Sequence, residues 1–256
     1  MQRFRVGVQI EPQHCTISEL RDTWRRAEEM GADSIYTWDH FFPLSGDQRG
    51  MHFEGWSLLA AMACDTTQAA IGVLVSCHSY RSPDLVADMA RTVDHVSGGR
   101  VVLGYGAGWA EHDYREYGFE FGTVRTRLAA LEPGVVRLKA RLARLNPPPV
   151  GRLPLMIGGE GERVTLRVAA EHADIWTGFG PVENFARKNR VLDAWCEKAG
   201  RGWSAIERSV LVNEPGDLDH IDEFAELGAQ EIIVPARAPF DLTDLAKVLR
   251  MADGRT

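Results

Sequence analysis

Short runs of apolar residues alternate along the chain with longer stretches in which apolar residues recur at helical spacing. The short runs have the length of buried strands, and the longer stretches have the period of amphipathic helices. The strands are expected at residues 4–10, 33–38, 70–76, 100–105, 155–157, 174–177, 209–212 and 231–234. The helices are expected between residues 16 and 31, and at 55–65, 83–97, 125–145, 163–172, 182–199, 218–227 and 242–251.

Local signals mark several of these boundaries. Thr16 and Glu19 form a capping-box pattern at the start of the first helix. Ser82 followed by Pro83 is typical of a helix N-terminus, and Gly98 with Gly99 ends that helix. The segment between the fourth strand and the fourth helix is rich in aromatic and acidic residues, and we expect it to be a loop.

Eight strand-then-helix units with short connections predict an α/β fold with parallel strands and right-handed crossovers. Units of this size match a closed (β/α)₈ TIM barrel of about 250 residues. The competing architecture is an open, doubly wound sheet. No break in composition divides the chain, so we predict a single barrel domain over residues 1–256.

Composition narrows the class of protein. The chain has 29 Lys and Arg against 36 Asp and Glu, a net charge of −7 that disfavours a nucleic-acid partner. The longest apolar runs, such as residues 71–75, are too short to cross a membrane, and no export signal is evident at the N-terminus. The four cysteines lack the spacing of a disulfide framework or zinc site, which favours reduced thiols in a cytoplasmic protein.

Glycine-rich segments follow two of the predicted strands, at the rim where barrel enzymes carry their sites. The turn at 158–161 presents backbone N–H groups at a helix N-terminus, which suits a phosphate. Only the backbone of Glu160 is expected to contribute, because its carboxylate would repel an anion. A tight turn that needs positive φ explains the same glycines equally well. Gly104, Gly106 and Gly108 would let a flat ring approach the backbone, or they reflect a narrow barrel mouth.

His40 is the candidate acid or base on this rim. It directly follows the second strand, and its ring is either catalytic or simply held by its neighbour Asp39. His78, His112 and Asp113 lie near the same rim, but no metal-ligand spacing occurs, and no metal site is predicted. The absence of a G-x-S-x-G elbow argues against a serine hydrolase of that fold.

An ordered set of motifs over about residues 15–180 resembles the luciferase-like monooxygenase superfamily, and within it the oxidoreductases that depend on the deazaflavin coenzyme F-420. Single motifs are weak, but their order is specific. The matching segments are 27–28, 31–34, 39–40, 54–56, 80–83, 90–94, 97–100, 103–109, 117–118, 157–163 and 169–176.

The resemblance implies a barrel that binds a flavin-type cofactor over its strand carboxyl ends and usually forms a homodimer. It also implies a non-prolyl cis peptide at Leu74–Val75, in a bulge that backs the ring. His40 would lie near the reactive edge of the ring as the catalytic residue. The cofactor-binding residues implied are His40, Leu74, Val75, Ser76, Gly106, Ala107, Gly108 and Trp109 for the ring and its side chain, and Gly158, Gly159, Glu160, Gly161 and Thr165 for the phosphate.

Three functions follow from this resemblance. The first is hydride transfer between coenzyme F-420 and a small organic substrate. The alternative is an FMN-dependent monooxygenase that uses oxygen, and the second alternative is a non-catalytic flavin- or deazaflavin-binding protein. A metal-dependent barrel hydrolase is a distant fourth.

The substrate pocket is expected in the loops at 11–15, 41–53, 109–122 and 178–181. Its candidate aromatic residues, which are equally compatible with a dimer contact, are Phe41, Phe42, Trp109 and Phe179. The family usually carries a longer excursion between the fourth helix and the fifth strand. Here residues 141–153 are short and proline-rich, which predicts a pocket that is open or covered by a partner.

Overall fold

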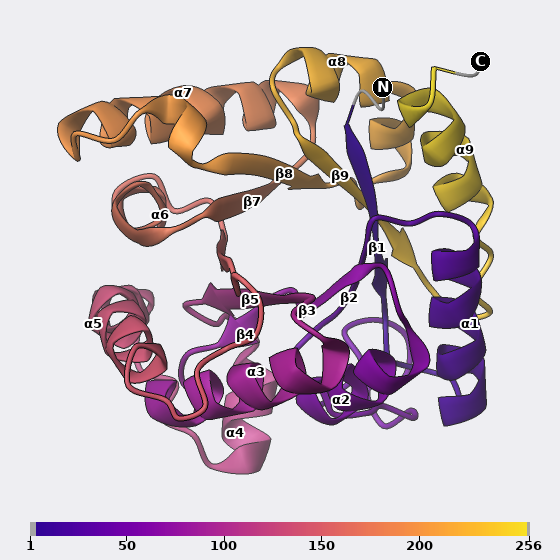
Figure 1. Ribbon diagram of the computed structural model, residues 1–256, viewed down its shortest axis with the longest axis horizontal. Helices are drawn as coiled ribbons and strands as arrows, with labels where there is room; N and C mark the ends of the chain where they lie inside the picture. The colour runs from indigo at the N-terminus through magenta and orange to yellow at the C-terminus, as the bar shows by residue number, and fades with distance from the viewer. Residues whose placement is uncertain (1–3, 255–256) are drawn as a thin grey trace.

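The strands of the computed structural model, which describes residues 4–254, form one closed parallel barrel (Figure 1). Their order is β3-β2-β1-β9-β8-β7-β6-β5-β4, and a parallel pairing between β3 and β5 closes the sheet on itself. This closure excludes the open, doubly wound alternative. The strands are β1 (Arg5–Ile10), β2 (Ser34–Thr37), β3 (Ala70–Val73), β4 (Ser76–Cys77), β5 (Val101–Gly106), β6 (Leu155–Gly158), β7 (Ile175–Phe179), β8 (Glu207–Leu211) and β9 (Glu231–Ala236).

The α-helices surround the barrel, as the ring of coiled ribbons in Figure 1 shows. They are α1 (Ile17–Glu29), α2 (Gly55–Asp65), α3 (Pro83–Ser97), α4 (Glu111–Tyr117), α5 (Val124–Leu142), α6 (Thr165–His172), α7 (Val182–Lys198), α8 (Ile221–Glu226) and α9 (Thr243–Ala252). Short 3₁₀ turns cover Trp203–Ala205 and Pro215–Asp219. Within residues 4–254, no helix combines the length and the apolar character needed to cross a membrane. The ends of the predicted domain, residues 1 and 256, lie outside the described residues.

Side chains alternate between two apolar layers because successive strand residues point to opposite faces. Outward-facing residues such as Ile35 and Val210 pack against the helices in the main core. Inward-facing residues fill the barrel itself. This inner cluster consists of Tyr36, Leu74, Val102, Met156, Ile175, Leu211 and Ile233.

Two local predictions were wrong in detail. The segment after β5 is not entirely a loop, because residues 111–117 form helix α4. This helix has two buried residues, Asp113 and Tyr114, so it lacks the apolar periodicity that identified the others. The predicted third strand at 70–76 is split into β3 and β4, which flank a cis peptide bond between Leu74 and Val75. The resemblance predicted this bond at the same position.

The connection from α5 to β6 is direct. Residues 143–154 contain no helix or strand, and Asn146–Pro147 is a cis X-Pro bond. His95 and Arg91 of α3 bond the carbonyl groups of Pro148 and Pro147 and so hold this connector against the barrel. The proline-rich segment therefore adds no cover over the strand carboxyl ends.

Candidate functional site

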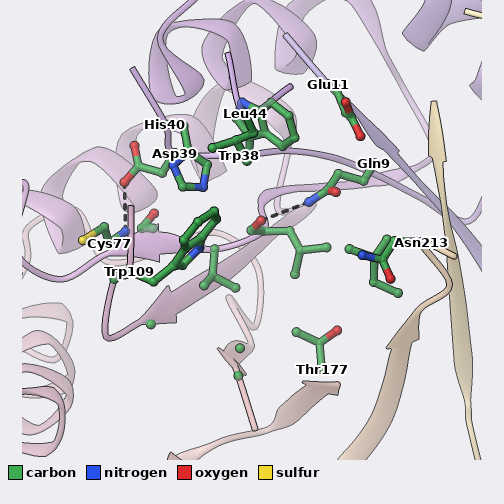
Figure 2. Close-up of a pocket in the computed structure, with 18 of the residues that line it drawn as sticks. Gln9, Glu11, Trp38, Asp39, His40, Leu44, Cys77, Trp109, Thr177 and Asn213 are labelled. Carbon is green, nitrogen blue, oxygen red and sulfur yellow. Dashed lines mark hydrogen bonds between the residues drawn. The ribbon is translucent and has the colours of Figure 1, made fainter. Parts of the chain in front are cut away.

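A cavity of about 660 Å³ opens at the carboxyl ends of the barrel strands (Figure 2). The loops that follow barrel strands form ligand sites in this fold, so its position is that of an active site. Each of the four segments predicted to build the pocket contributes to the cavity wall. Their contributions are Glu11, Gln13, Leu44, Ser45, Trp109 and Phe179.

Most of the cofactor-binding residues implied by the resemblance line this one cavity. Those on the wall are His40, Leu74, Val75, Ser76, Gly106, Ala107, Gly108, Trp109, Gly158, Gly159 and Thr165. Glu160 and Gly161 lie outside the cavity lining. Residues separated by up to 125 positions in the sequence therefore meet at the carboxyl ends of β2, β4, β5 and β6.

The glycines of β5 and β6 make room for the side chain of Val75. A Cβ atom on Gly106 would lie 2.7 Å from Val75 Cγ2, and one on Gly158 would lie 2.8 Å from Val75 Cγ1. A Cβ atom on Gly104 would lie 2.1 Å from the Val73 carbonyl oxygen and 3.0 Å from Val75 Cγ1, so this glycine admits the neighbouring backbone as well. We call these three glycines the Val75 socket. The two explanations given from sequence were a ring lying close to the backbone and a narrow barrel mouth. The structure adds a third for Gly104 and Gly106, because the absence of a side chain there makes room for Val75.

The backbone at the Leu74–Val75 bulge is held from inside the barrel. The Gln9 side-chain amide donates a hydrogen bond of 3.1 Å to the Leu74 carbonyl oxygen (Figure 2). On the far side, Trp56 Nε1 donates to Ser76 Oγ at 3.0 Å, and Trp56 is buried in the core. The bulge therefore forms a fixed surface on the cavity wall, and the Ser76 hydroxyl is already engaged.

The turn from Gly158 to Gly161 has the properties of an anion site. Gly159 has φ +116°, a conformation that favours glycine. Within the described chain, the backbone N–H groups of residues 160–164 donate to no acceptor. Glu160 Oε1 accepts hydrogen bonds from Phe179 N (3.1 Å) and Asn184 Nδ2 (2.7 Å). The Glu160 carboxylate is thus anchored to the neighbouring β7–α7 segment, which leaves the turn itself without a side-chain charge.

The positive φ of Gly159 confirms the tight-turn explanation, and the phosphate explanation stays a prediction with which the free N–H groups are compatible. Thr165 begins α6 just beyond the turn and is 4% exposed on the cavity wall. A Cβ atom on Gly161 would lie 2.8 Å from Thr165 Oγ1, so Gly161 lets the hydroxyl group approach the turn. Gly161 thus shapes the turn although it does not line the cavity.

The hydrogen-bond partner of His40 is Asp113. The sequence had suggested its neighbour Asp39 instead. His40 Nδ1 lies 2.7 Å from Asp113 Oδ2, and Asp113 also accepts from Phe41 N and Tyr80 Oη. Burial raises the pKa of Asp113, but these hydrogen bonds outweigh it and lower the pKa below its usual range. Since an ionised carboxylate only accepts, Nδ1 carries the proton, and Nε2 is available on the side of the cavity.

Asp39 has a different role at the end of β2. Its carboxylate accepts two hydrogen bonds from Arg81 Nη1, at 2.8 and 2.9 Å, and one of 3.0 Å from Cys77 N. Burial raises its pKa to about 6, against the lowering effect of Arg81. Arg81 also bonds Glu54, the N-cap of α2. The Asp39, Glu54 and Arg81 motifs therefore form one ion-pair network that fixes the loops behind His40.

Trp38 extends this arrangement toward the opening. Its indole Nε1 donates to His52 Nε2 at 2.9 Å, and its ring lies edge-on to His40 with centroids 5.7 Å apart. Burial lowers the pKa of His52 to about 4, with a further effect from the charge of His40. His52 is therefore neutral near pH 7 and accepts the hydrogen bond that orients Trp38.

This neutral state predicts an acid-sensitive contribution to stability. The pKa of His52 is below its unfolded value of about 6.5, so the unfolded chain takes up a proton first as the pH falls. The free energy of unfolding should fall by roughly 2 kcal/mol between pH 6.5 and 4, after allowance for partial exposure. His52→Gln keeps an acceptor for Trp38 and should remove this part of the slope. Urea unfolding of the wild type and the variant across that pH range measures the free energy of unfolding. If this free energy fell equally with pH in both proteins, His52 would not be the group responsible.

Two of the predicted chamber aromatics lie elsewhere. Phe41 stacks on Tyr117 with ring centroids 4.0 Å apart, and Phe42 packs on His112 with centroids 4.5 Å apart. Neither lines the cavity. Trp38 takes their place on the wall together with the predicted Trp109 and Phe179.

The sequence reading missed the cavity wall formed by the first and last strands. Gln9 belongs to β1, Asn213 lies two residues after the end of β8, and Arg237 directly follows β9. These residues could have been found from the sequence, because polar residues at strand carboxyl ends are candidate site residues in any barrel. The predictions concentrated on glycines and histidines instead. The wall residues that were not named as site residues include Gln9, Trp38, Thr177, Leu211, Asn213, Pro235 and Arg237.

The closed parallel barrel and the cavity at its strand carboxyl ends define a (β/α)₈-barrel protein with a ligand site on its functional rim. A family model described as luciferase-like monooxygenase matches residues 2–213. The chain therefore belongs to the luciferase-like monooxygenase family, as the motifs predicted.

Individual relatives are similar at moderate identity. The F420-dependent glucose-6-phosphate dehydrogenase of Amycolatopsis mediterranei is 31% identical over 135 residues, which cover 52% of this chain and 40% of that protein. The 5,10-methylenetetrahydromethanopterin reductase of Archaeoglobus fulgidus is 26% identical over 231 residues, 84% of this chain and 65% of that protein. The chain thus spans between 40% and 65% of the length of these two relatives.

A solved structure shares the fold over almost its whole length. It is an F420-dependent secondary alcohol dehydrogenase in complex with an F420–acetone adduct, with a TM-score of 0.85 and 16% sequence identity. The superposition covers 98% of this chain and 99% of that one. At this identity the likeness establishes the barrel fold, which was the predicted one.

Proposed function

We propose that this protein is an oxidoreductase that binds coenzyme F-420 and transfers hydride between the coenzyme and a small organic molecule. The observation that carries the proposal is the cavity itself. It combines a fixed backbone wall at Leu74–Val75, an anion-type turn at 158–161 and a histidine with a free Nε2. Family membership and the F420-dependent relatives support a deazaflavin as the ligand.

The cavity residues fit such a group. Leu74 and Val75 with Gly106 would back the ring, and the free N–H groups of residues 160–164, which join the wall residues Gly159 and Thr165, would hold its phosphate. The Thr177 hydroxyl on the cavity wall is 3% exposed and has no hydrogen-bond partner among the described residues, as expected where a ligand supplies one. When bound, the coenzyme supplies the carbon that accepts or donates hydride.

The protein's own contribution to the reaction is a directed proton transfer. Asp113 fixes the His40 tautomer with the proton on Nδ1, so Nε2 can take a proton from a substrate hydroxyl group. Asp113 also stabilises the imidazolium that results, because its carboxylate remains ionised beside it. In the reverse direction the same Nε2 returns the proton to a carbonyl oxygen.

Cofactor titration tests the proposal. We expect the fluorescence of purified protein to be quenched at low micromolar F-420, with weaker or no response to FMN. FMN binding together with oxygen-dependent turnover would support the monooxygenase alternative instead. Tight F-420 binding without reduction by any donor, unchanged in His40→Ala, would identify a non-catalytic binding protein. Binding of neither cofactor would refute the proposal.

Asp113→Asn tests whether the carboxylate positions His40. An amide at this position can donate to Nδ1, which would move the proton to Nε2 and remove the base. We expect kcat to fall roughly 100-fold, with KM changed less than about threefold. The affinity for F-420 should stay within about threefold of the wild-type value, because Asp113 lies outside the cavity lining.

The matched control for this variant is Tyr80→Phe. It removes only the hydrogen bond of 3.0 Å from Tyr80 Oη to Asp113 and leaves the carboxylate in place. We expect a loss of kcat of less than about tenfold, with KM unchanged. Equal losses of kcat in both variants would reduce Asp113 to a structural role.

The assembly state and location remain predictions. The resemblance implies a homodimer, and the cysteine pattern favours the cytoplasm. The proposed partners are a small-molecule substrate and the coenzyme.

A further inference from the structure

A second cavity, of about 570 Å³, opens at the amino-terminal ends of the barrel strands, at the end opposite the proposed cofactor site. The residues that begin β1, β2, β3, β5, β7, β8 and β9 line its wall. We call it the lower cavity. The proposed function uses no residue of this wall, so a ligand bound there would be a second one.

Glu231, the first residue of β9, places a carboxylate in the lower cavity and is only 1% exposed. Ser34 Oγ donates to Glu231 Oε1 at 2.5 Å, and Tyr36 Oη lies 3.2 Å from the same oxygen. The other oxygen, Oε2, has only the Tyr36 hydroxyl, at 3.4 Å. Because a tyrosine has a single O–H group and that group lies nearer to Oε1, Oε2 is left without a close donor.

The negative charge of Glu231 is not balanced by a side chain. Within residues 4–254, Glu231 forms no ion pair with Lys, Arg or His. Arg5 is its register partner on β1, but the Arg5 guanidinium bonds Glu207 instead. Arg100 bonds backbone carbonyl groups, and Arg152 bonds a different carboxylate of the wall. One buried negative charge therefore remains, whereas buried charges in proteins are normally paired or coordinate a metal ion.

Ser209 supplies a second oxygen without a partner at the same level of the barrel. It is the register partner of Glu231 on β8, and it is 0% exposed. The residues two positions further along these strands, Leu211 and Ile233, belong to the inner cluster, so the side chains of Ser209 and Glu231 also point into the barrel. The Ser209 hydroxyl has no hydrogen-bond partner among the described residues, although buried hydroxyl groups are normally bonded.

A glycine on β1 makes room for this arrangement. Gly7 is the register partner of Ser34 on one side and of Ile233 on the other. A Cβ atom on Gly7 would overlap Ser34 Oγ and lie 3.0 Å from Ile233 Cγ1. The missing side chain therefore lets Ser34 reach Glu231 and hold Oε1, which leaves Oε2 for another partner.

From these contacts we infer that the lower cavity contains a site for a monovalent alkali cation, sodium or potassium, bound between Glu231 Oε2 and Ser209 Oγ. The ligands are oxygen atoms, which hard cations prefer, and the lower cavity has no imidazole or thiolate on its wall. A single uncompensated carboxylate matches a single positive charge. A water molecule would satisfy the Ser209 hydroxyl but would leave the charge of Glu231 unbalanced.

Such a cation should stabilise the folded protein, because the unfolded chain does not bring the two oxygen atoms together. Urea unfolding is measured in mixtures of potassium chloride and tetramethylammonium chloride at a constant total of about 0.5 M, which keeps the screening of surface charges equal. Replacing all tetramethylammonium by potassium should lower the unfolding equilibrium constant roughly 10-fold, the effect of one site with a dissociation constant near ~50 mM. A second series uses sodium chloride in place of potassium chloride. Broadening of the sodium NMR signal by the folded protein, reversed by potassium chloride, measures binding without unfolding.

Two variants separate the site from a general salt effect. Glu231→Gln keeps an oxygen that can accept from Ser34 and removes the charge, so replacing tetramethylammonium should change its unfolding constant less than about twofold. Ser209→Ala removes the other ligand and should weaken cation affinity at least roughly threefold. Ser209→Ala carries the test alone if Glu231→Gln does not fold.

Asp174→Asn is the matched control. Asp174 lines the same cavity, but its carboxylate already accepts from Arg152 and from Leu155 N, each at 2.9 Å. This variant should keep the wild-type dependence on potassium. Equal stability of the wild type in potassium, sodium and tetramethylammonium chloride would overturn the site, as would an undiminished potassium effect in Glu231→Gln or Ser209→Ala. Stabilisation by magnesium chloride with none by the alkali chlorides would overturn the monovalent assignment.

Discussion

His40→Ala should lower kcat roughly 10³-fold while leaving the affinity for F-420 within about threefold of the wild-type value. In the proposed mechanism His40 Nε2 transfers the proton, whereas the walls proposed for the cofactor are mostly backbone and apolar groups. Steady-state kinetics with the fastest substrate found for the F-420-bound protein, together with the fluorescence titration, separate the two effects.

His112→Ala is the matched control, because His112 lies on the same rim but packs against Phe42 outside the cavity lining. It should change kcat by less than about twofold. If His40→Ala kept more than a tenth of the wild-type rate, the proton would have to move through another group. If it lost F-420 affinity in proportion to rate, His40 would be a binding residue only.

Gly158→Ala should weaken F-420 binding roughly 30-fold, by forcing the Val75 side chain out of its socket. The added Cβ atom would lie 2.8 and 3.0 Å from the two Val75 methyl groups, closer than carbon atoms approach one another. Because Val75 belongs to the bulge that forms the cavity wall, its displacement changes the surface on which the ring would lie. The same overpacking should cost about 1–3 kcal/mol of stability.

A second substitution distinguishes this mechanism from a general loss of folding. Val75→Ala removes both methyl groups that the new Cβ atom meets, so the double variant should regain most of the F-420 affinity and stability. Gly202→Ala serves as control, since its Cβ atom would meet only Ser204 Oγ at 3.8 Å. A double variant no better than Gly158→Ala alone would show that the socket is not the cause.

The barrel was predictable because its signals are local. Most strands are short apolar runs, and four of the nine α-helices in the described chain begin at a side-chain cap, such as Thr16 with Glu19 and Ser82 with Pro83. Helix α4 was missed because it buries little and its N-cap residue, Ala110, makes no side-chain hydrogen bond. Its weaker signals were the acidic first turn and Gly118 at its end, where φ is +71°.

The site was predictable in position but not in its contacts. Fold rules locate chemistry at strand carboxyl ends, which identified His40 and the glycine turn at 158–161. The partner of His40 lies 73 residues away in the missed helix, and spacing alone favoured the adjacent Asp39. The Val75 socket likewise joins β5, β6 and the bulge between β3 and β4, so no single stretch of sequence reveals that the glycines accommodate a valine.

The origin of the His40 partner in α4 has an evolutionary consequence. Asp113 comes from a short excursion between β5 and α5, whereas the walls proposed for the cofactor belong to the barrel itself. Insertions, deletions or replacements in residues 110–122 can therefore change the partner of His40 and leave the proposed coenzyme site intact. We expect homologues to diversify their proton chemistry through this exchangeable segment while their ring-binding strands drift more slowly.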